Sequence, residues 1–293
     1  MGITRSRHPD ATPPTPSPGP GGGAIRWRRY VALGDSFTEG LWDVPGGAAA
    51  SRTDLNDPGL RCRGWADLLA GHLADRVADA DGEPVRYANL AVRGKLLAPI
   101  LREQVPAALE LGPDLVSLIG GGNDLLRTGS DPDTMAAGLE EAVVRLRAGG
   151  ADVLLGTGVD ARDSPLVRRT RPLVGVLNAH VWTIARRHDA HVLDLWGMRS
   201  LRDWRMWAPD RIHLTTQGHR RVAQAALVAL GLPPDDEAWD TPLVPLAPAR
   251  WTEQRRADAM WVRDHAYPWA TRRLRGRSSG DDRRPKRPEL TPV

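Results

Sequence analysis

The stretch Tyr30-Val-Ala-Leu-Gly-Asp-Ser-Phe-Thr-Glu-Gly40 decides how this chain is expected to fold. Its first four residues form a short apolar run, which is typical of a buried strand. Gly34 then allows a sharp turn, and Ser36 falls where the strand leads into a helix. Backbone N–H groups at the start of a helix are unpaired and can face a developing negative charge. Ser36 is therefore a candidate nucleophile if a base lies beside it, although Gly-Asp-Ser also occurs in ordinary helix-capping turns.

Three later stretches contain the residue types that such a serine needs. They are Tyr87-Ala-Asn-Leu-Ala-Val-Arg-Gly94, Gly120-Gly-Gly-Asn-Asp124 and Asp210-Arg-Ile-His213. The first two follow predicted strands, and the third lies on a loop near the end of the αβ pattern. In chain order the four stretches supply a serine, a glycine, an asparagine and a histidine. Over about residues 30–231 the sequence therefore resembles the SGNH (GDSL-type) hydrolase family of esterases and lipases, whose four sequence blocks carry these residues.

The wider sequence alternates short apolar runs with amphipathic segments. Strands are predicted at residues 30–33, 85–90, 115–119, 151–155 and 191–195, and helices at residues 65–80, 96–111, 133–148, 172–188 and 215–230. This alternation is typical of an α/β protein with a five-stranded parallel sheet and helices on both faces, a three-layer α/β/α sandwich. The resemblance implies the flavodoxin-like (SGNH hydrolase) strand order 2-1-3-4-5. Ligands of such sheets bind beyond the carboxyl ends of the strands, where all four stretches fall.

The chain is predicted to have four parts. Residues 1–29 form a leader rich in proline and glycine, and residues 30–231 form the hydrolase domain. Residues 232–270 form an extension whose tryptophans would be costly to expose, so we expect it to dock on the domain, partly as a helix over residues 251–269. Residues 271–293 form a basic tail. Leader and tail contain too little apolar surface to fold, so we expect both to be disordered and dispensable for the chemistry.

The formal net charge of +4 is unevenly distributed along the chain. Residues 1–29 carry a net charge of +4 and residues 271–293 carry +5, which leaves −5 for residues 30–270. The basic character belongs to the two ends, so the folded body is not expected to bind nucleic acid.

Composition also bears on location and cofactors. No apolar run is long enough to span a membrane, and the N-terminal residues lack the apolar segment of a secretory signal, so a cytoplasmic location is expected. The single cysteine, Cys62, excludes an internal disulfide and a cysteine-based zinc site. His219 has no third ligand at a suitable spacing, so we expect neither a metal nor another cofactor.

Ester cleavage needs a nucleophile, a base, a group that orients the base, and donors for the oxyanion. The resemblance assigns Ser36 as the nucleophile and His213 as the base. Asp210 precedes His213 by three residues, so on a tight turn its carboxylate can reach the imidazole and hold its tautomer. The resemblance implies an oxyanion hole made of the backbone N–H groups of Ser36 and Gly94 and the side-chain amide of Asn123.

Neighbouring residues bear on substrate choice. The missing side chain of Gly94 would let a substrate approach its amide. The charges of the flanking Arg93 and Lys95 could influence substrate choice or only face solvent, and we expect them to face solvent. Two long loops near the site carry tryptophans that could line an acyl pocket, stack on a sugar ring or simply pack the loops. These substrate-pocket candidates are Trp42, Trp204 and Trp207.

The predicted function is hydrolysis of carboxylic esters, with small-molecule substrates and short acyl chains such as acetyl. Thioesterase, carbohydrate deacetylase and lipase activities would share the same site. Two other classes stay open. A non-catalytic flavodoxin-like binding module would need a phosphate-binding glycine pattern, and the sequence has no Gly-x-Gly-x-x-Gly after a strand. A protein that binds nucleic acid or a membrane surface through the basic tail is the other alternative.

Overall fold

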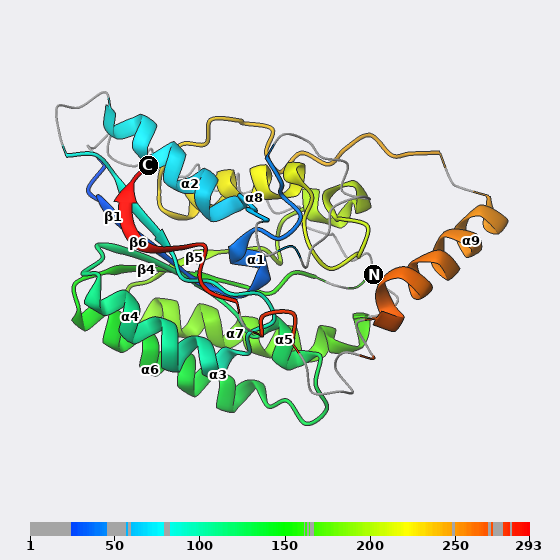
Figure 1. Ribbon diagram of the computed structural model, residues 1–293, viewed down its shortest axis with the longest axis horizontal. Coiled ribbons are helices and arrows are strands. Elements are labelled where there is room, and N and C mark those ends of the chain that lie inside the picture. The colour runs from blue at the N-terminus through cyan, green and yellow to red at the C-terminus, as the bar shows by residue number, and fades with distance from the viewer. Residues whose placement is uncertain are drawn as a thin grey trace, which may run out of the picture.

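The computed structural model describes residues 25–45, 57, 60–78, 83–160, 162, 164, 167–247, 250–268, 271, 278–281 and 283–293. Within these residues a six-stranded sheet forms the centre of the protein, in the order β5-β4-β3-β1-β2-β6 (Figure 1). The strands are β1 Arg29–Gly34, β2 Arg86–Asn89, β3 Leu115–Ile119, β4 Asp152–Gly156, β5 His191–Leu193 and β6 Arg287–Pro292. The first five are parallel, and their order is the implied 2-1-3-4-5. The three-layer fold is confirmed, with β6 as an additional antiparallel edge strand.

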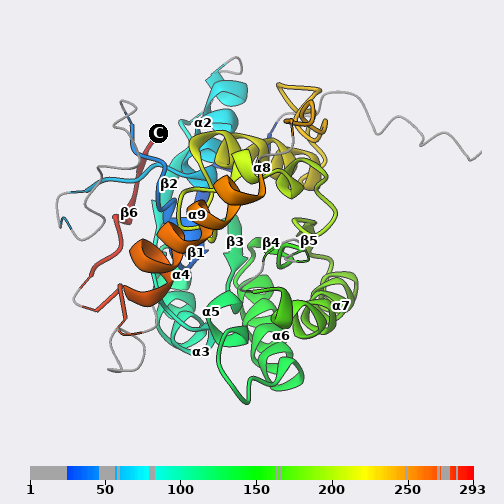
Figure 2. The same ribbon diagram turned by 90° about the vertical axis from the view of Figure 1, so that its right-hand side faces the viewer.

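Helices cover both faces of the sheet (Figures 1 and 2). One face carries α2 Trp65–Ala78 and α8 Thr216–Ala229. The other carries α3 Leu97–Pro99, α4 Val105–Glu110, α6 Pro132–Ala148 and α7 Arg171–Arg187. Two short helices follow strands directly, α1 Ser36–Glu39 after β1 and α5 Gly122–Leu125 after β3. Figure 2 looks onto the carboxyl ends of the parallel strands and shows α9 Trp251–Trp261 in front of them.

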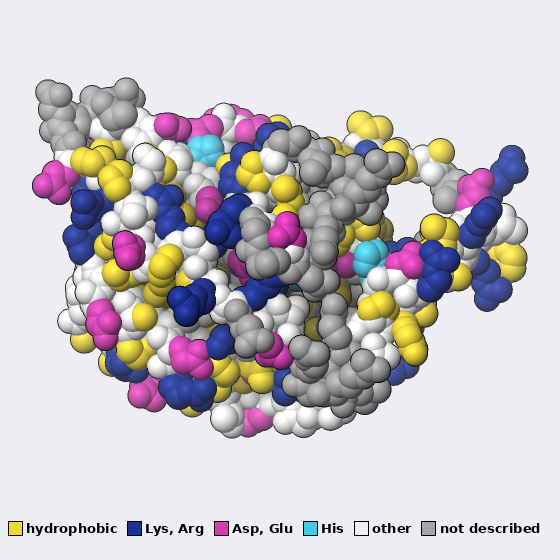
Figure 3. Space-filling model, in the orientation of Figure 1, with side chains coloured by type: hydrophobic (Ala, Val, Ile, Leu, Met, Phe, Trp, Pro, Cys, Tyr) yellow, Lys and Arg dark blue, Asp and Glu magenta, His cyan; other side chains and the backbone are white. Residues whose placement is uncertain are grey.

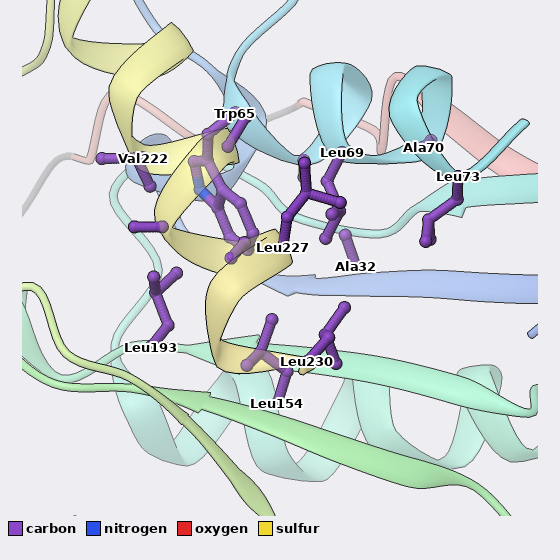
Figure 4. Close-up of a cluster of buried hydrophobic side chains, with 14 of the residues drawn as sticks. Ala32, Trp65, Leu69, Ala70, Leu73, Leu154, Leu193, Val222, Leu227 and Leu230 are labelled. Carbon is purple, nitrogen blue, oxygen red and sulfur yellow. The ribbon is translucent and has the colours of Figure 1, made fainter. Parts of the chain in front are cut away.

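The side chains of β1 alternate between two hydrophobic cores, as the period of a strand requires. Tyr30 and Ala32 belong to the core under α2 and α8, while Val31 and Leu33 belong to the core on the opposite face. Figure 4 shows the first of these cores, in which one face of each helix lies against the sheet. Its labelled residues are Ala32, Trp65, Leu69, Ala70, Leu73, Leu154, Leu193, Val222, Leu227 and Leu230. Burial of each large aliphatic side chain contributes about 1.5–3 kcal/mol, and this fixes the helices on the strands.

The helix predicted over residues 96–111 is divided into three elements. Between α3 and α4 the hydrogen bonding widens to a π-helix over Ile100–Gln104. Pro106 lies in the first turn of α4, has no backbone N–H, and so cannot donate to the carbonyl four residues earlier. The π turn accommodates this missing bond without ending the helical path.

The C-terminal tail differs from the sequence-based expectation of disorder. Among its described residues, β6 pairs with β2, with Tyr87 opposite Thr291 and Asn89 opposite Arg287. Val293 continues the contact by donating its N–H to Val85 O at 3.0 Å. The basic composition of the tail suggested disorder, but its backbone groups pair with the open edge of β2. We call residues 278–281 and 283–293 the C-terminal strap.

The N-terminal leader and the extension adjoin the two ends of the predicted hydrolase domain. Residues 1–24 of the predicted leader lie outside the described residues, but Ile25 and Trp27 are buried in the core. The Trp27 indole donates to Asp152 Oδ2 at 2.8 Å, so the packed body begins before residue 30. In the extension, the Trp261 indole donates to Asp210 O at 3.0 Å.

In the described chain, no helix combines the length and apolarity needed to cross a membrane. On the visible described surface of one face, basic and acidic side chains are interspersed rather than segregated (Figure 3).

Candidate active site

Ser36 lies directly beyond the end of β1. A Cβ on Gly34 would lie 2.4 Å from Ile119 O, so only glycine fits at this turn. Asp35 then caps α1 by accepting the Phe37 N–H at 3.0 Å, which makes Ser36 the first residue of the helix. The backbone N–H of Ser36 therefore has no partner within its own helix.

The loop before α8 brings a histidine and an aspartate to this serine. His213 Nε2 lies 2.7 Å from Ser36 Oγ, and His213 Nδ1 lies 2.7 Å from Asp210 Oδ2. Asp210 Oδ1 also accepts the N–H groups of Ile212 and His213, both at 3.0 Å, which closes a tight turn. Arg211, with φ +60°, allows that turn. The structure thus brings the three predicted catalytic side chains into one hydrogen-bonded chain.

Electrostatics favour a charged Asp210 and a basic His213. Burial alone would raise the pKa of Asp210, but the nearby imidazole and the hydrogen bonds to its carboxylate hold that pKa well below its usual range. Burial would lower the pKa of His213, but the Asp210 carboxylate outweighs it and raises the pKa above 6.5. An imidazolium formed during proton transfer would be stabilised in this arrangement.

The three tryptophans proposed for the pocket have different roles in the structure. The Trp42 indole donates to Asp210 Oδ2 at 2.6 Å, so this buried residue helps to hold the aspartate, a contact that sequence reasoning missed. The Trp207 indole donates to Leu201 O at 2.7 Å. Trp204 is 42% exposed. All three line the cavity that contains Ser36.

The two remaining residues of the predicted oxyanion hole also line this cavity. Gly94 has φ +73°, and its N–H has no hydrogen-bond acceptor among the described residues. The Asn123 amide donates to Lys95 O at 3.0 Å and to Asp35 Oδ2 at 3.2 Å. Asn123 therefore connects the segment after Gly94 to the residue before Ser36.

The expectation that Arg93 faces solvent is wrong. Arg93 is 2% exposed, and its Nε donates to Glu39 Oε1 at 2.8 Å, while its backbone N–H donates to Glu39 Oε2 at 2.7 Å. Glu39 is the last residue of α1, so this pair fastens the residue before Gly94 to the helix that begins with Ser36. Lys95 does lie nearer the surface, where it pairs with Glu103 at 2.6 Å.

Two buried titratable groups lie close to the site. Burial raises the pKa of Asp35 to about 6, despite the hydrogen bond from Phe37. Burial lowers the pKa of His219 to about 4. His219 Nδ1 accepts the Trp65 N–H at 3.2 Å, which gives it a structural role. Across the described ranges, no group of three His, Cys, Asp or Glu side chains is arranged to hold a metal ion.

The cavity at Ser36 has a volume of about 870 Å³. Much of its lining is apolar, with contributions from β3, α6 and α7 that include Leu118, Leu139, Leu177 and Val181. The extension adds Met260, Trp261 and His265 to the lining. The sequence predicted only that the extension docks on the domain, and it gave no residue of the extension a place at the site.

A family model described as the GDSL-like Lipase/Acylhydrolase family matches residues 32–221. The chain belongs to this family. This GDSL-like acylhydrolase is accordingly a carboxylic ester hydrolase, and the resemblance noted from its four sequence blocks is confirmed. The match ends before the extension and the C-terminal strap.

Solved structures similar to this GDSL-like acylhydrolase include TesA, at 25% identity and a TM-score of 0.50, with 69% of this chain and 97% of TesA covered. Axe2, an acetylxylan esterase from Geobacillus stearothermophilus, has 22% identity and a TM-score of 0.54, with 70% and 94% covered. The psychrotrophic esterase EstA from Pseudoalteromonas sp. has 17% identity and a TM-score of 0.51, with 70% and 97% covered. Axe2 and EstA show a shared fold. No curated protein gave a significant match.

Proposed function

We propose that the protein is a serine esterase that works through an acyl-enzyme on Ser36, with His213 as the base and Asp210 as its orienting group. One observation carries this proposal. The hydrogen-bonded chain from Ser36 through His213 to Asp210 has two 2.7 Å contacts, and it opens into a cavity large enough for a substrate.

In the proposed reaction, Ser36 Oγ attacks the ester carbonyl carbon while His213 Nε2 accepts the hydroxyl proton. The tetrahedral intermediate collapses, the alkoxide leaves, and His213 returns the proton to it, which releases the alcohol. Water then attacks the acyl-enzyme with His213 again as the base, and the acid leaves as Ser36 regains its proton. Asp210 stays ionised throughout and stabilises the imidazolium.

The oxyanion would be held by the N–H groups of Ser36 and Gly94 and by the Asn123 amide. Asn123 donates both of its hydrogens in the structure, to Lys95 O and to Asp35 Oδ2. The bond to Asp35 is the longer of the two, so we propose that a small rotation of the planar amide breaks this bond and directs its N–H to the oxyanion when the charge develops. The bond to Lys95 O would then keep the amide in position.

The cavity favours acyl groups longer than the acetyl group expected from sequence. Acetyl would contact little of an apolar wall that reaches α6 and α7, including Leu139 and Val181. Burial of one methylene is worth about 0.8 kcal/mol. On p-nitrophenyl esters, kcat/KM should therefore rise roughly 3- to 4-fold per methylene from acetyl to hexanoyl. If kcat/KM instead declined for acyl chains longer than acetyl, the short-chain preference expected from sequence would hold. Parallel assays with a thioester and with acetylated xylan would show which leaving group the enzyme prefers.

Covalent labelling tests the nucleophile directly. A fluorophosphonate should modify Ser36 in the wild-type protein, as located by peptide mass spectrometry, and should not modify Ser36→Ala. Ser164 offers a matched control because it is buried and lines the same cavity. Ser164→Ala should be labelled at the wild-type rate. Labelling of another residue in wild-type protein would overturn the assignment of Ser36.

A further inference from the structure

The C-terminal strap packs directly on the glycine of the proposed oxyanion hole. Ser278 Oγ donates to Gly94 O at 3.3 Å, and a Cβ on Gly94 would lie 2.2 Å from the same Ser278 Oγ. A Cβ on Gly280 would lie 1.9 Å from Arg93 O. The side of Gly94 that we expected to admit substrate is therefore occupied by the Ser278 hydroxyl, and neither Gly94 nor Gly280 has room for a side chain.

A lysine anchors the strap on the helix of the nucleophile. Lys286 Nζ donates to Glu39 O at 2.6 Å, to Cys62 O at 2.8 Å and to Arg63 O. It also pairs with Asp67 Oδ2 at 2.6 Å, and its side chain is 11% exposed. Removal of a buried, fully hydrogen-bonded ammonium group would leave several acceptors and one carboxylate without their partner.

These contacts meet at the same few residues. Glu39 accepts Lys286 with its carbonyl and Arg93 with its carboxylate, so one residue joins the lysine of the strap to the residue before Gly94. Beyond Lys286, β6 pairs with β2, the strand that leads into Gly94. The strap thus holds the Gly94 segment from the outside and is fastened to α1, which starts at Ser36.

We propose that the C-terminal strap is a positioning element of the active site, in which Lys286 and the turn at Gly280 hold the Gly94 N–H in register with Ser36. This inference rests on the esterase function proposed above. It reverses the expectation that the tail is dispensable for the chemistry. The strap lies beyond residues 32–221, which the family model matches.

The test uses full-length variants that release the strap in two different ways. Lys286→Met removes the anchor, and Gly280→Ala forces the turn away from Arg93 O while Lys286 is retained. Arg284→Met is the matched control, because Arg284 is an exposed cation on the same strap. Turnover is measured per active site after titration with the fluorophosphonate, so that a loss of folded protein does not count as a loss of turnover.

Loss of a complete oxyanion donor costs about 100- to 1000-fold in kcat, and a displaced donor should cost less. We expect kcat per titrated site to fall about 10- to 100-fold in both strap variants, with KM within about 3-fold of wild type and Arg284→Met unchanged. Hydrogen exchange at residues 93–95 should accelerate in the two strap variants and not in the control.

Two outcomes would overturn the inference. Wild-type kcat per titrated site in both strap variants would show that the strap only stabilises the fold. Unchanged exchange at residues 93–95 would show that the strap does not hold this segment. Because exchange is measured without substrate, it tests the strap even if wild-type protein fails to cleave esters. That failure would count against the proposed function alone. If Lys286→Met does not fold, Gly280→Ala decides the result.

Discussion

The two sides of Ser36 are held together in opposite ways. On the base side, Asp210 and His213 are three residues apart, and the turn between them is closed by its own backbone N–H groups. On the oxyanion side, Gly94 is held by groups from distant parts of the chain. These are Glu39 at the end of α1, Asn123 after β3 and Ser278 on the strap.

Because of this difference, the two halves of the chemistry should be sensitive to substitutions in different parts of the protein. The turn on the base side closes with its own hydrogen bonds, to which the Trp42 and Trp261 indoles each add one contact with Asp210, so the base side should respond mainly to substitutions within the turn. A segment assembled from several elements transmits a change in any one of them. Substitutions far from Ser36 should therefore lower kcat by weakening the stabilisation of the oxyanion rather than by impairing His213 as a base.

The largest expected effect comes from the residues that form the acyl-enzyme. Ser36→Ala removes the attacking atom and His213→Ala removes its base, so each should bring turnover of a p-nitrophenyl ester close to background. Because the two residues act as one unit, the double variant should be no slower than either single variant. If the losses of the two single variants multiplied in the double variant, Ser36 and His213 would act independently, and their assignment as one catalytic unit would be wrong.

The next effect separates the oxyanion side from the base side. Asn123→Ala should lower kcat about 100- to 1000-fold, roughly 3–4 kcal/mol, because its amide would stabilise charge present only in the transition state. Asn178→Ala is the control, since Asn178 lines the same cavity but bonds the backbone of Gly158. It should keep wild-type kcat per titrated site. An equal loss in both variants would point to general damage to the cavity.

The pH dependence reports mainly on the base side, because the pKa of Asp35, another titrating group beside Ser36, is raised only to about 6. His213 acts as a base only when neutral, so activity should be lost as pH falls through its pKa, which Asp210 holds above 6.5. Below that midpoint kcat/KM should fall about tenfold per pH unit. Asp210→Asn should lower the midpoint as well as the rate, because the carboxylate that raises the pKa is removed. If the midpoint of the pH profile were the same in Asp210→Asn as in the wild-type protein, the coupling between Asp210 and His213 would be contradicted.

The smallest expected effect tests whether the base side is self-contained. Trp42→Phe removes the indole N–H that bonds Asp210 Oδ2 at 2.6 Å and keeps most of the packing. Since the turn has its own hydrogen bonds that still hold the carboxylate, we expect only about a 3- to 10-fold loss of kcat, which is the size of effect for an ordinary hydrogen bond and less than that for a bond to a charged group. Trp207→Phe, which loses a bond to Leu201 O instead, is the control. A loss as large as that of Asp210→Asn would show that the base side also depends on distant support.

The sequence predicted best those features that are decided over a few residues. The strand Leu115–Ile119 was predicted with both of its ends, because a run that is apolar except for Ser117 follows Asp114 and stops at consecutive glycines. The spacing of Asp210 and His213 likewise implied a turn that the structure contains. In both cases, neighbouring residues carry the whole signal.

Contacts between distant segments could not be predicted in this way. Trp42 and Asp210 are 168 positions apart, and Lys286 and Glu39 are 247 positions apart. Composition indicates whether a segment can fold by itself, and the composition of the tail is typical of a disordered chain. Its order depends on acceptors that the body supplies, such as Glu39 O and the edge of β2, and nothing in the tail sequence encodes them.

The position of β6 at the edge of the sheet has a consequence for synthesis. β6 leaves the ribosome after every other strand of the sheet, so in a nascent chain β2 has unpaired N–H and C=O groups along one edge. Exposed edges of this kind template pairing with other chains and promote aggregation. The opposite edge strand, β5, is open in the full chain as well, but it has only three residues. Chains that stop before residue 287 should therefore aggregate more readily than the full chain, because the edge of their sheet at β2 is never closed.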